Sequence, residues 1–210
     1  MLVSASKENI LKKIRKALTQ STPIPFPASE GTGALFNPGN QDMEIEFGEQ
    51  FSKLLGKFLY CADENEFRKQ LDALIAFNNW ENIFCKEDAI KQILPQALVT
   101  ALSDDLTNAQ AALTTCEALV ARTGTIIMSS AQQSGRLTSV YASVHICVAY
   151  TNQLVYDVKD GLQLIKEKYT NKIPSLVTFA TGPSRTADIE KTLVVGVHGP
   201  KEVYVFLIEK

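Results

Sequence analysis

The feature that most constrains this chain is an alternation, from residue 42 onward, between short apolar runs and stretches with apolar residues at helical spacing. The short runs are rich in β-branched residues, which favour strands, and occupy 58–61, 82–85, 111–114, 125–129, 144–150, 176–181 and 203–208. Helices are predicted at 47–58, 67–75, 86–94, 116–121, 157–169 and 186–193. This rhythm predicts a three-layer α/β/α fold with a mainly parallel sheet.

The first 41 residues are expected to form an arm, separate from a folded domain over 42–210. Residues 7–18 place apolar side chains at helical spacing beside several lysines, which predicts a short amphipathic helix with a basic side. Residues 21–41 are rich in proline and glycine and are predicted to be a connector. We expect the helix to dock on its own or a sister subunit, which would give a homo-oligomer; acidic lipid or nucleic acid is the alternative partner.

Charge and hydropathy argue against two classes of partner. The 210 residues carry 21 basic and 23 acidic side chains, a net charge of -2, so no overall basic field favours nucleic acid or anionic lipid. The longest apolar runs are far shorter than the roughly 20 residues of a membrane-spanning helix. The first residues lack the pattern of a secretory signal, so the expected location is cytoplasmic.

The cysteines show no spacing typical of a metal or iron-sulfur site, and no metal or other cofactor is expected. Cys61, Cys85, Cys116 and Cys147 lie far apart in the sequence, each among apolar neighbours, which predicts buried reduced thiols. The common hydrolase, nucleotide-triphosphatase and dinucleotide-binding motifs are also absent from the sequence.

In an α/β/α fold, ligands bind beyond the carboxyl ends of the strands, so the loops there are examined first. The first such loop holds Arg122, Thr123, Gly124 and Thr125. Gly124 can be the left-handed residue that ends a helix. Alternatively, the turn offers amide and hydroxyl donors to an anion.

The second loop spans 129–139 and combines small hydroxyl side chains with one guanidinium, that of Arg136. Arg136 can hold a carboxylate or phosphate, or it can be a solvated surface residue. His145 follows on an apolar strand. It is either a hydrogen-bonded core histidine or an acid or base beside a loop.

The third loop begins with Thr181-Gly182-Pro183, and a helix is expected to follow it. Ser184 or Thr186 can cap this helix, and its free amides together with Arg185 would form an anion-receiving corner. Asp188 and Glu190 complement the helix dipole, so a capped helix without any ligand is the alternative. His198 follows in a Gly-Pro turn and reaches a ligand only if the loops converge.

Four short runs carry a family resemblance: A-R-T-G-T at 121–125, G-R-L-T-S at 135–139 followed by His145, T-G-P-S-R-T-A-D-I-E at 181–190, and G-V-H-G-P at 196–200. With them the sequence resembles the LUD (lactate-utilisation) domain family over roughly residues 110–210. The family usually has an acidic residue where this chain has Arg122, a departure expected to make the site more basic.

The resemblance implies a fold similar to the ribose-5-phosphate isomerase, glucosamine-phosphate isomerase and coenzyme A transferase superfamily. It also implies a role in a three-component system that oxidises L-lactate to pyruvate, with the iron-sulfur clusters on partner subunits. The ligand expected is a small carboxylate or phosphate. The residues expected to bind it are Thr123, Gly124, Thr125, Arg136, Thr181, Gly182, Ser184, Arg185 and Thr186.

Three functions are consistent with the sequence. The leading hypothesis is an accessory component of a lactate-oxidising system whose basic corner of Arg136, Ser184 and Arg185 binds a small carboxylate. The second is a freestanding enzyme acting on a phosphorylated or carboxylated metabolite. Its candidate acids and bases are His145, Asp188, Glu190 and His198. The third is a structural protein whose motifs are only caps and turns.

Overall fold

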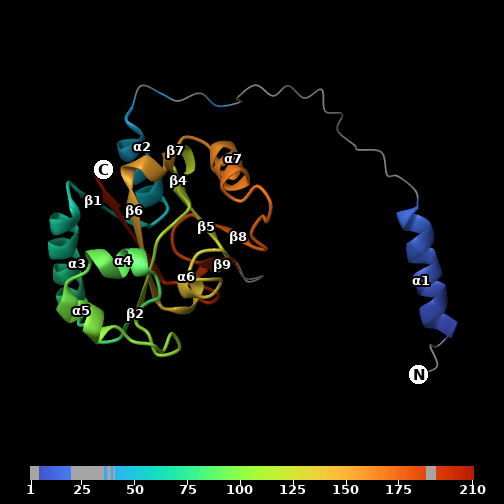
Figure 1. The fold of residues 1–210 in the computed structure, drawn as a ribbon, viewed down its shortest axis with the longest axis horizontal. Coiled ribbons are helices and arrows are strands. Elements are labelled where there is room, and N and C mark those ends of the chain that lie inside the picture. The colour runs from blue at the N-terminus through green and yellow to red at the C-terminus, as the bar shows by residue number, and fades with distance from the viewer. Residues whose placement is uncertain (1–4, 20–35, 37–38, 40, 188–192) are drawn as a thin grey trace. The chain divides into compact units, whose positions relative to one another are not determined.

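The computed structural model describes residues 5–19, 36, 39, 41–187 and 193–210 (Figure 1). By its internal contacts the chain divides into two units, one up to residue 37 and one from residue 38 onward. In the first unit, helix α1 spans Ala5–Leu18 and agrees with the helix predicted over 7–18. Most of the predicted connector, and the candidate residues Asp188 and Glu190, lie outside the described residues.

A five-stranded sheet, parallel throughout, forms the centre of the second unit. Its strand order is β1-β11-β6-β3-β2. Strand β6 is therefore the middle strand, and β11 and β3 pair with it on either side. Each strand overlaps one predicted from the sequence. The bounds are β1 Lys57–Cys61, β2 Ile83–Cys85, β3 Ala111–Thr114, β6 Val144–Tyr150 and β11 Glu202–Ile208.

Both faces of this sheet are buried, as the uninterrupted apolar sequence of β11 requires. Tyr204, Phe206 and Ile208 point to one face and join a core with the helices α3 Glu64–Asn78 and α4 Asp88–Ile93. The helix α5 Gln96–Ala101 packs at the margin of the same face. The alternate residues Val203, Val205 and Leu207 join a second core on the opposite face.

The opposite face is covered by helix α2, Met43–Lys53, and by a second, four-stranded sheet (Figure 1). That sheet has the order β7-β4-β5-β8, and helix α7, Val158–Lys168, packs on its outer side. Its strands are β4 Ala118–Val120, β5 Thr125–Ser129, β7 Leu154–Val155 and β8 Val177–Ala180. The predicted α/β class, with a mostly parallel central sheet and helices on both sides, is confirmed.

The helix predicted over 116–121 is wrong. This segment is strand β4, followed by the 3-10 turn Ala121–Thr123. All three residues of β4 are fully buried, between β5 and β7 in the second sheet. A short run of mostly apolar residues does not by itself distinguish a helix from a buried strand, and the pairing of β4 with β5 and β7 determines the outcome here.

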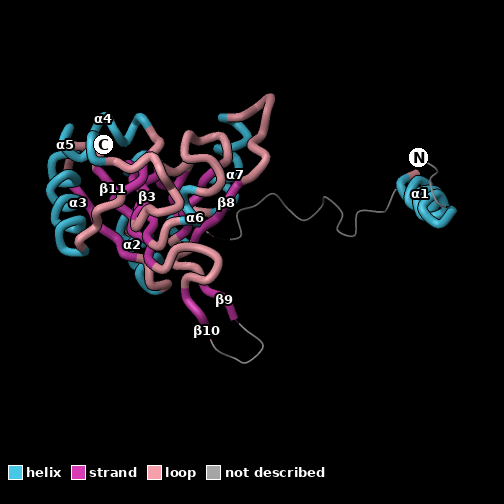
Figure 2. Tube along the Cα trace, turned by 90° about the horizontal axis from the view of Figure 1, so that it is seen from below, coloured by secondary structure: helices cyan, strands magenta, loops and turns pink. Residues whose placement is uncertain are grey.

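The helix predicted over 186–193 is wrong at both of its ends, and residues 188–192 between them lie outside the described residues. Here β9, Arg185–Ala187, and β10, Leu193–Val195, form an antiparallel pair that extends away from the two sheets (Figure 2). Thr186 pairs with Val194, two β-branched residues that favour strands over helices. The helix predicted over 47–58 is displaced, because α2 ends at Lys53 and the chain turns at Leu54 and Leu55 to enter β1.

The side chain of Asp63 caps α3 by accepting a hydrogen bond from the Glu66 amide at 2.8 Å. All four cysteines are free and buried, which confirms the prediction of core thiols. Among the helices of the described ranges, none is long and apolar enough to span a membrane.

We expect Phe206→Ala to lower the free energy of unfolding by about 3–5 kcal/mol, because the change leaves a cavity in a dense core. Phe206 is fully buried and packs edge-on against Phe67, with ring centroids 5.3 Å apart. Urea unfolding of the second unit, followed by fluorescence, measures the change. Phe77→Ala is the matched control, since that ring is 84% exposed, and should shift the value by less than about 0.5 kcal/mol. Equal losses for both variants would contradict this assignment of the core.

Candidate functional site

A cavity of about 380 Å³ brings together residues from five separated segments of the chain, at 128, 139–140, 145, 178–184 and 198–203. It lies where the end of β8, the loop that enters β11 and the start of β6 meet. Five of the residues singled out from the sequence line it: His145, Thr181, Gly182, Ser184 and His198. The third loop and His198 therefore do converge, and they converge on His145.

The position of this cavity differs in part from the expected one. It lies beyond the carboxyl end of β8, but at the amino ends of β6 and β11 in the parallel sheet. The register explains why. His145 pairs with Val203 at the start of both strands, which places the loop before β11 directly beside the imidazole. The general rule for parallel sheets predicts a site at the carboxyl ends of the strands, so it did not predict a cavity at the amino ends of β6 and β11.

His145 is the most deeply buried polar residue of the cavity, with only 1% of its surface exposed. Its Nε2 lies 2.8 Å from the Thr114 hydroxyl, while its Nδ1 is buried without a partner in the described structure. Burial lowers the pKa of His145 to about 4, so the imidazole is neutral near pH 7. The residue is thus both a hydrogen-bonded core histidine and part of a cavity wall.

A chain of three threonine hydroxyls connects the first loop with the cavity. The hydroxyls of Thr123 and Thr125 lie 2.7 Å apart, and that of Thr125 lies 3.0 Å from that of Thr181, which lines the cavity. Gly124 has φ +59, and a Cβ there would overlap the backbone of Phe51. The T-G-T turn therefore packs against α2, and its Thr125 hydroxyl contacts Thr181 of the cavity wall.

Over its described residues, 181–187, the third loop enters strand β9 and not a helix, so these residues do not form the expected corner of free amides. The Ser184 amide donates to the Pro200 carbonyl at 2.9 Å, and the Ser184 carbonyl accepts from the Gly196 amide at 2.9 Å. Arg185 donates a hydrogen bond to the Leu54 carbonyl instead of facing the cavity, and Thr186 lies in β9. Gly182, with φ +89, approaches the same Leu54 carbonyl closely.

The two other arginines singled out from the sequence lie elsewhere. Arg136 lines a separate cavity of about 310 Å³ together with Lys86, and it donates to the Ser175 hydroxyl at 2.5 Å. Arg122 forms an ion pair of 2.9 Å with Asp157. The structure therefore places Arg136 and Ser184 in different cavities, and the three-residue basic corner is not assembled.

The ion pair of Arg122 also has an electrostatic consequence. The hydrogen bond from its guanidinium is the main cause that holds the pKa of Asp157 below its usual value. The other oxygen of Asp157 accepts from the Lys159 amide at 3.3 Å and caps α7. Arg122 thus places its positive charge beside a capping carboxylate rather than in the cavity wall.

Sequence reasoning missed several polar groups of the site region. Ser139 and Thr178 add hydroxyls to the cavity, and Thr114 holds His145 from behind. The signal for Thr114 was its position at the end of a predicted strand next to the His145 strand. None of the described lining residues is Lys, Arg, Asp or Glu, so two imidazoles and hydroxyls set the polarity of the wall.

Glu117 is a second omission, because it falls in the segment mistaken for a helix. Its buried carboxylate accepts from Ser129 at 2.5 Å, from Tyr169 at 2.8 Å and from Lys168 at 2.8 Å. Burial raises the pKa of Glu117, but these hydrogen bonds outweigh it and the net shift is downward. The group ties α7 to the second sheet. Within the described ranges, no cluster of three His, Cys, Asp or Glu side chains could hold a metal ion.

Taken together, the fold and the site define an α/β protein with a hydroxyl- and imidazole-lined cavity between a parallel sheet and a smaller mixed sheet. The sequence profile of the LUD domain family matches residues 45–208. The chain therefore belongs to the LUD domain family.

Individual relatives extend this result. The chain is 36% identical over 105 residues to a protein of Deinococcus radiodurans named lactate utilization protein C, and the match covers 50% of this chain and 49% of that protein. It thus spans about half the length of that relative. A protein of Neisseria meningitidis serogroup B, described as uncharacterized, is 32% identical over 97% of this chain and 94% of its own length.

A solved structure shows the same fold. The crystal structure of a DUF162 family protein from Deinococcus radiodurans superimposes with a TM-score of 0.60 at 20% identity, covering 79% of this chain and 96% of that one.

We expect His145 to make the protein less stable as the pH falls from about 6.5 to about 4. Its pKa is lower in the folded state than the value near 6.5 of an exposed histidine, so protonation favours the unfolded chain. The free energy of unfolding should have its full value above pH 6.5 and be lower by about 3 kcal/mol once the pH has fallen to about 4. Urea unfolding at several pH values measures it.

The control for this pH dependence is a variant without the imidazole. His145→Gln should have a flatter stability profile than the parent protein over this pH range, because the titrating group is removed. Parallel profiles for the parent and His145→Gln would show that His145 does not titrate in this way.

Proposed function

We propose that this chain is an accessory component of a lactate-utilising system and that its cavity binds a small carboxylate. In this proposal the iron-sulfur clusters that oxidise L-lactate to pyruvate belong to partner subunits. Membership of the LUD domain family supports the proposal, as do relatives named lactate utilization protein C, which share about 32–36% identity with this chain.

The observation that carries the binding proposal is the convergence of His145, whose buried Nδ1 has no hydrogen-bond partner in the described structure, and His198 on one hydroxyl-lined cavity. A buried polar atom without a hydrogen bond costs about 1–3 kcal/mol, so such atoms are rare in folded proteins. His145 is buried and lines the cavity, and its Nε2 already has the Thr114 hydroxyl as a partner. A ligand oxygen in the cavity would satisfy the remaining nitrogen.

The pairing with Thr114 also indicates the kind of atom that Nδ1 can bind. If the Thr114 hydroxyl donates to Nε2 of His145, the single proton of the neutral ring lies on Nδ1, which then donates to an oxygen. The hydroxyls of Thr181 and Ser184 are available from the opposite loop. Such a set suits one carboxylate together with a neighbouring hydroxyl or carbonyl.

A carboxylate fits this wall better than a phosphate. Phosphate groups, which carry more charge, are typically bound by arginine or lysine side chains. Among the described lining residues only the two imidazoles can carry a positive charge, and His145 is neutral near pH 7. His198, on the exposed loop before β11, is the second imidazole of the wall and can donate a hydrogen bond to a carboxylate oxygen.

The packing of the cysteines supports placing the clusters on partner subunits. Cys61 and Cys85 belong to the core beneath α3 and α4, and Cys116 and Cys147 belong to the core beneath α2. Each thiol is a packed core group, so using it as a cluster ligand would open the core that holds the sheets together.

A freestanding enzyme is the second candidate, favoured by the presence of two imidazoles in one cavity. In that case His198 would be the acid or base, because the pKa of His145 is too low for it to carry a proton near pH 7. Turnover of a carboxylate by the isolated chain, without any partner, would favour this candidate over the accessory role.

The binding proposal predicts that L-lactate or pyruvate binds the purified chain and that inorganic phosphate binds more weakly. We expect His198→Ala to weaken carboxylate binding by roughly tenfold, the loss typical of one charge-assisted hydrogen bond. Isothermal titration calorimetry measures this. Arg136→Ala is the control and should bind like the parent, since Arg136 lines a different cavity. Loss of binding in Arg136→Ala but not in His198→Ala would place the site in that other cavity.

The accessory role has its own test, which is a lactate-dependent dye-reduction assay with the iron-sulfur partner subunits. We expect the rate to rise when this chain is added, because the proposal makes it a component of the system. His198→Ala should raise the rate less than the parent chain does. Equal rates with and without the chain would count against the accessory role, whatever the calorimetry shows.

A further inference from the structure

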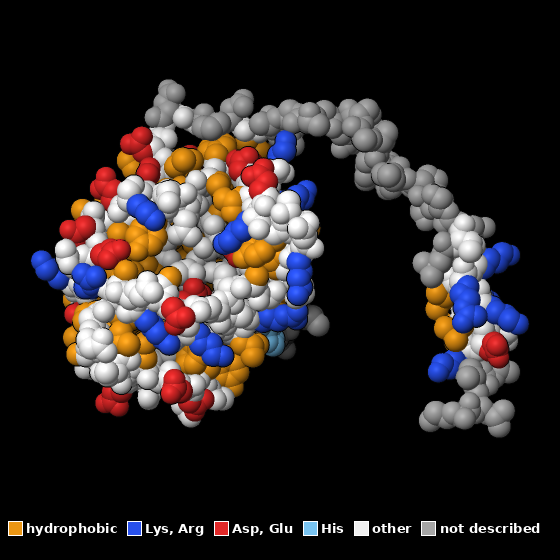
Figure 3. All heavy atoms as spheres, in the orientation of Figure 1, with side chains coloured by type: hydrophobic (Ala, Val, Ile, Leu, Met, Phe, Trp, Pro, Cys, Tyr) orange, Lys and Arg blue, Asp and Glu red, His pale blue; other side chains and the backbone are white. Residues whose placement is uncertain are grey.

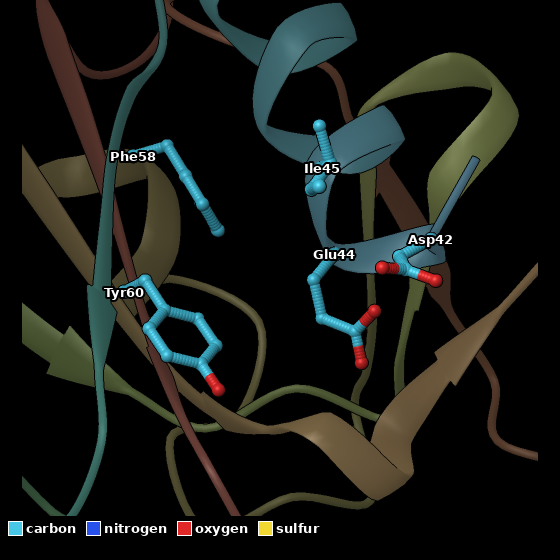
Figure 4. A pocket seen from close by; sticks show the side chains of 5 residues that line it. All are labelled: Asp42, Glu44, Ile45, Phe58 and Tyr60. Atoms are coloured by element: carbon cyan, nitrogen blue, oxygen red, sulfur yellow. The ribbon is translucent and has the colours of Figure 1, made fainter.

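A groove unrelated to the histidine cavity lies between the start of α2 and strand β1. It has a volume of about 510 Å³ and is lined by Asp42, Glu44, Ile45, Phe58 and Tyr60. Figure 4 shows Phe58 and Tyr60 of β1 facing Ile45 and Glu44 of α2 across the opening. The groove adjoins an edge of the parallel sheet, because β1 is its first strand.

The floor of the groove is apolar and accessible, and its rim is acidic. Ile45 is 52% exposed although it is a large aliphatic side chain. Partial burial, a hydrogen bond with Glu209 and the charges of Glu44 and Glu66 raise the pKa of the Tyr60 hydroxyl. Lys57, the basic residue of β1, is held by Glu202 at 2.6 Å. The rim therefore has a surplus of negative charge beside exposed apolar surface.

Helix α1 has the opposite character. Ile10 and Ile14, 58% and 49% exposed, form with Leu11 an apolar stripe along one side. At about 100° per residue, Lys13 and Arg15 lie on either side of that stripe. Figure 3 shows hydrophobic side chains along one edge of this helix, and lysine and arginine side chains together with the acidic side chain of its first turn elsewhere on it.

Such a helix needs a partner surface to be stable. Isolated helices of about 12–15 residues are marginal in water, and most of their stability in proteins comes from packing an apolar face. α1 has 14 residues and presents its apolar stripe to solvent. The complement of this stripe and its basic flanks is an apolar groove with an acidic rim.

We propose that the groove between α2 and β1 binds helix α1 of a second copy of this chain, so that two copies exchange their arms. Ile10, Leu11 and Ile14 would cover Ile45 and Phe58, and Lys13 and Arg15 would meet the carboxylates of the rim. This is the helix-in-groove mode of recognition, in which apolar anchors give affinity and charges set specificity.

A second copy fits because one contact of this kind is small. Three aliphatic anchors bury little area, but reciprocal exchange fills two grooves with two helices and closes as a two-fold dimer. The same patch on both subunits then provides the whole interface. The proposal is independent of the ligand in the histidine cavity, since that cavity and the groove have no lining residue in common.

The test is the mass of the full-length chain in solution, measured by sedimentation at a low and a high protein concentration. We expect a dimer whose dissociation constant rises roughly tenfold or more in Asp42→Lys/Glu44→Lys, and likewise in Lys13→Glu/Arg15→Glu. Combining all four changes should restore dimerisation, because the opposite charges meet again. Asp72→Lys/Glu81→Lys, two exposed acidic positions outside the groove, is the matched control and should dimerise like the parent.

Folding of each variant is checked by its thermal unfolding midpoint. Asp42 makes no side-chain capping bond to α2, so its reversal should not unfold the helix. A parent chain that stays monomeric at both concentrations would overturn the proposal and favour another occupant of the groove. Variants that dimerise like the parent, or a fourfold variant without rescue, would overturn it by showing that the dimer uses another surface.

Discussion

The pairing of β11 with β6 is the interaction on which the rest of the structure depends. These two strands pair over seven residues in parallel, and β11 sends apolar side chains to both faces. One face then requires α3 and α4, and the other requires α2 and the second sheet. The same pairing sets His145 opposite Val203, so the register that builds both cores also brings the loop before β11 to the imidazole.

The register of the second sheet brings the remaining cavity residues into place. β8 pairs antiparallel to β5, with Ala180 opposite Ile126, so that Thr181 follows at the level of Thr125. Their hydroxyls meet at 3.0 Å, and the chain after Thr181 crosses toward the start of β11. His145 is thus enclosed between the two sheets, where its hydrogen bond with the Thr114 hydroxyl is stronger than it would be in water.

The apolar runs of β5, β6 and β11 could be predicted from the sequence because nearly all of their residues are buried, whichever neighbour they have. The segments 116–121 and 186–193 could not, since their few apolar residues suit a helix as well as a strand and only pairing partners decide between them. His145, Ser184 and His198 could be singled out from residue type. The partners of the arginines could not, because Leu54, Ser175 and Asp157 are distant in sequence and one is a backbone carbonyl.

Arg122 illustrates how a charge remote from the cavity is fixed by its surroundings. Its guanidinium meets a carboxylate that is already fixed at the N-terminus of α7, where Asp157 caps the helix. An acidic residue at 122 would face that carboxylate with like charge and weaken the cap. Arg122 and Asp157 therefore depend on each other, and together they anchor the T-G-T turn to α7. The T-G-T turn contacts Thr181 through the Thr125 hydroxyl. The ion pair of Arg122, although remote from the cavity, therefore contributes to the position of the cavity wall.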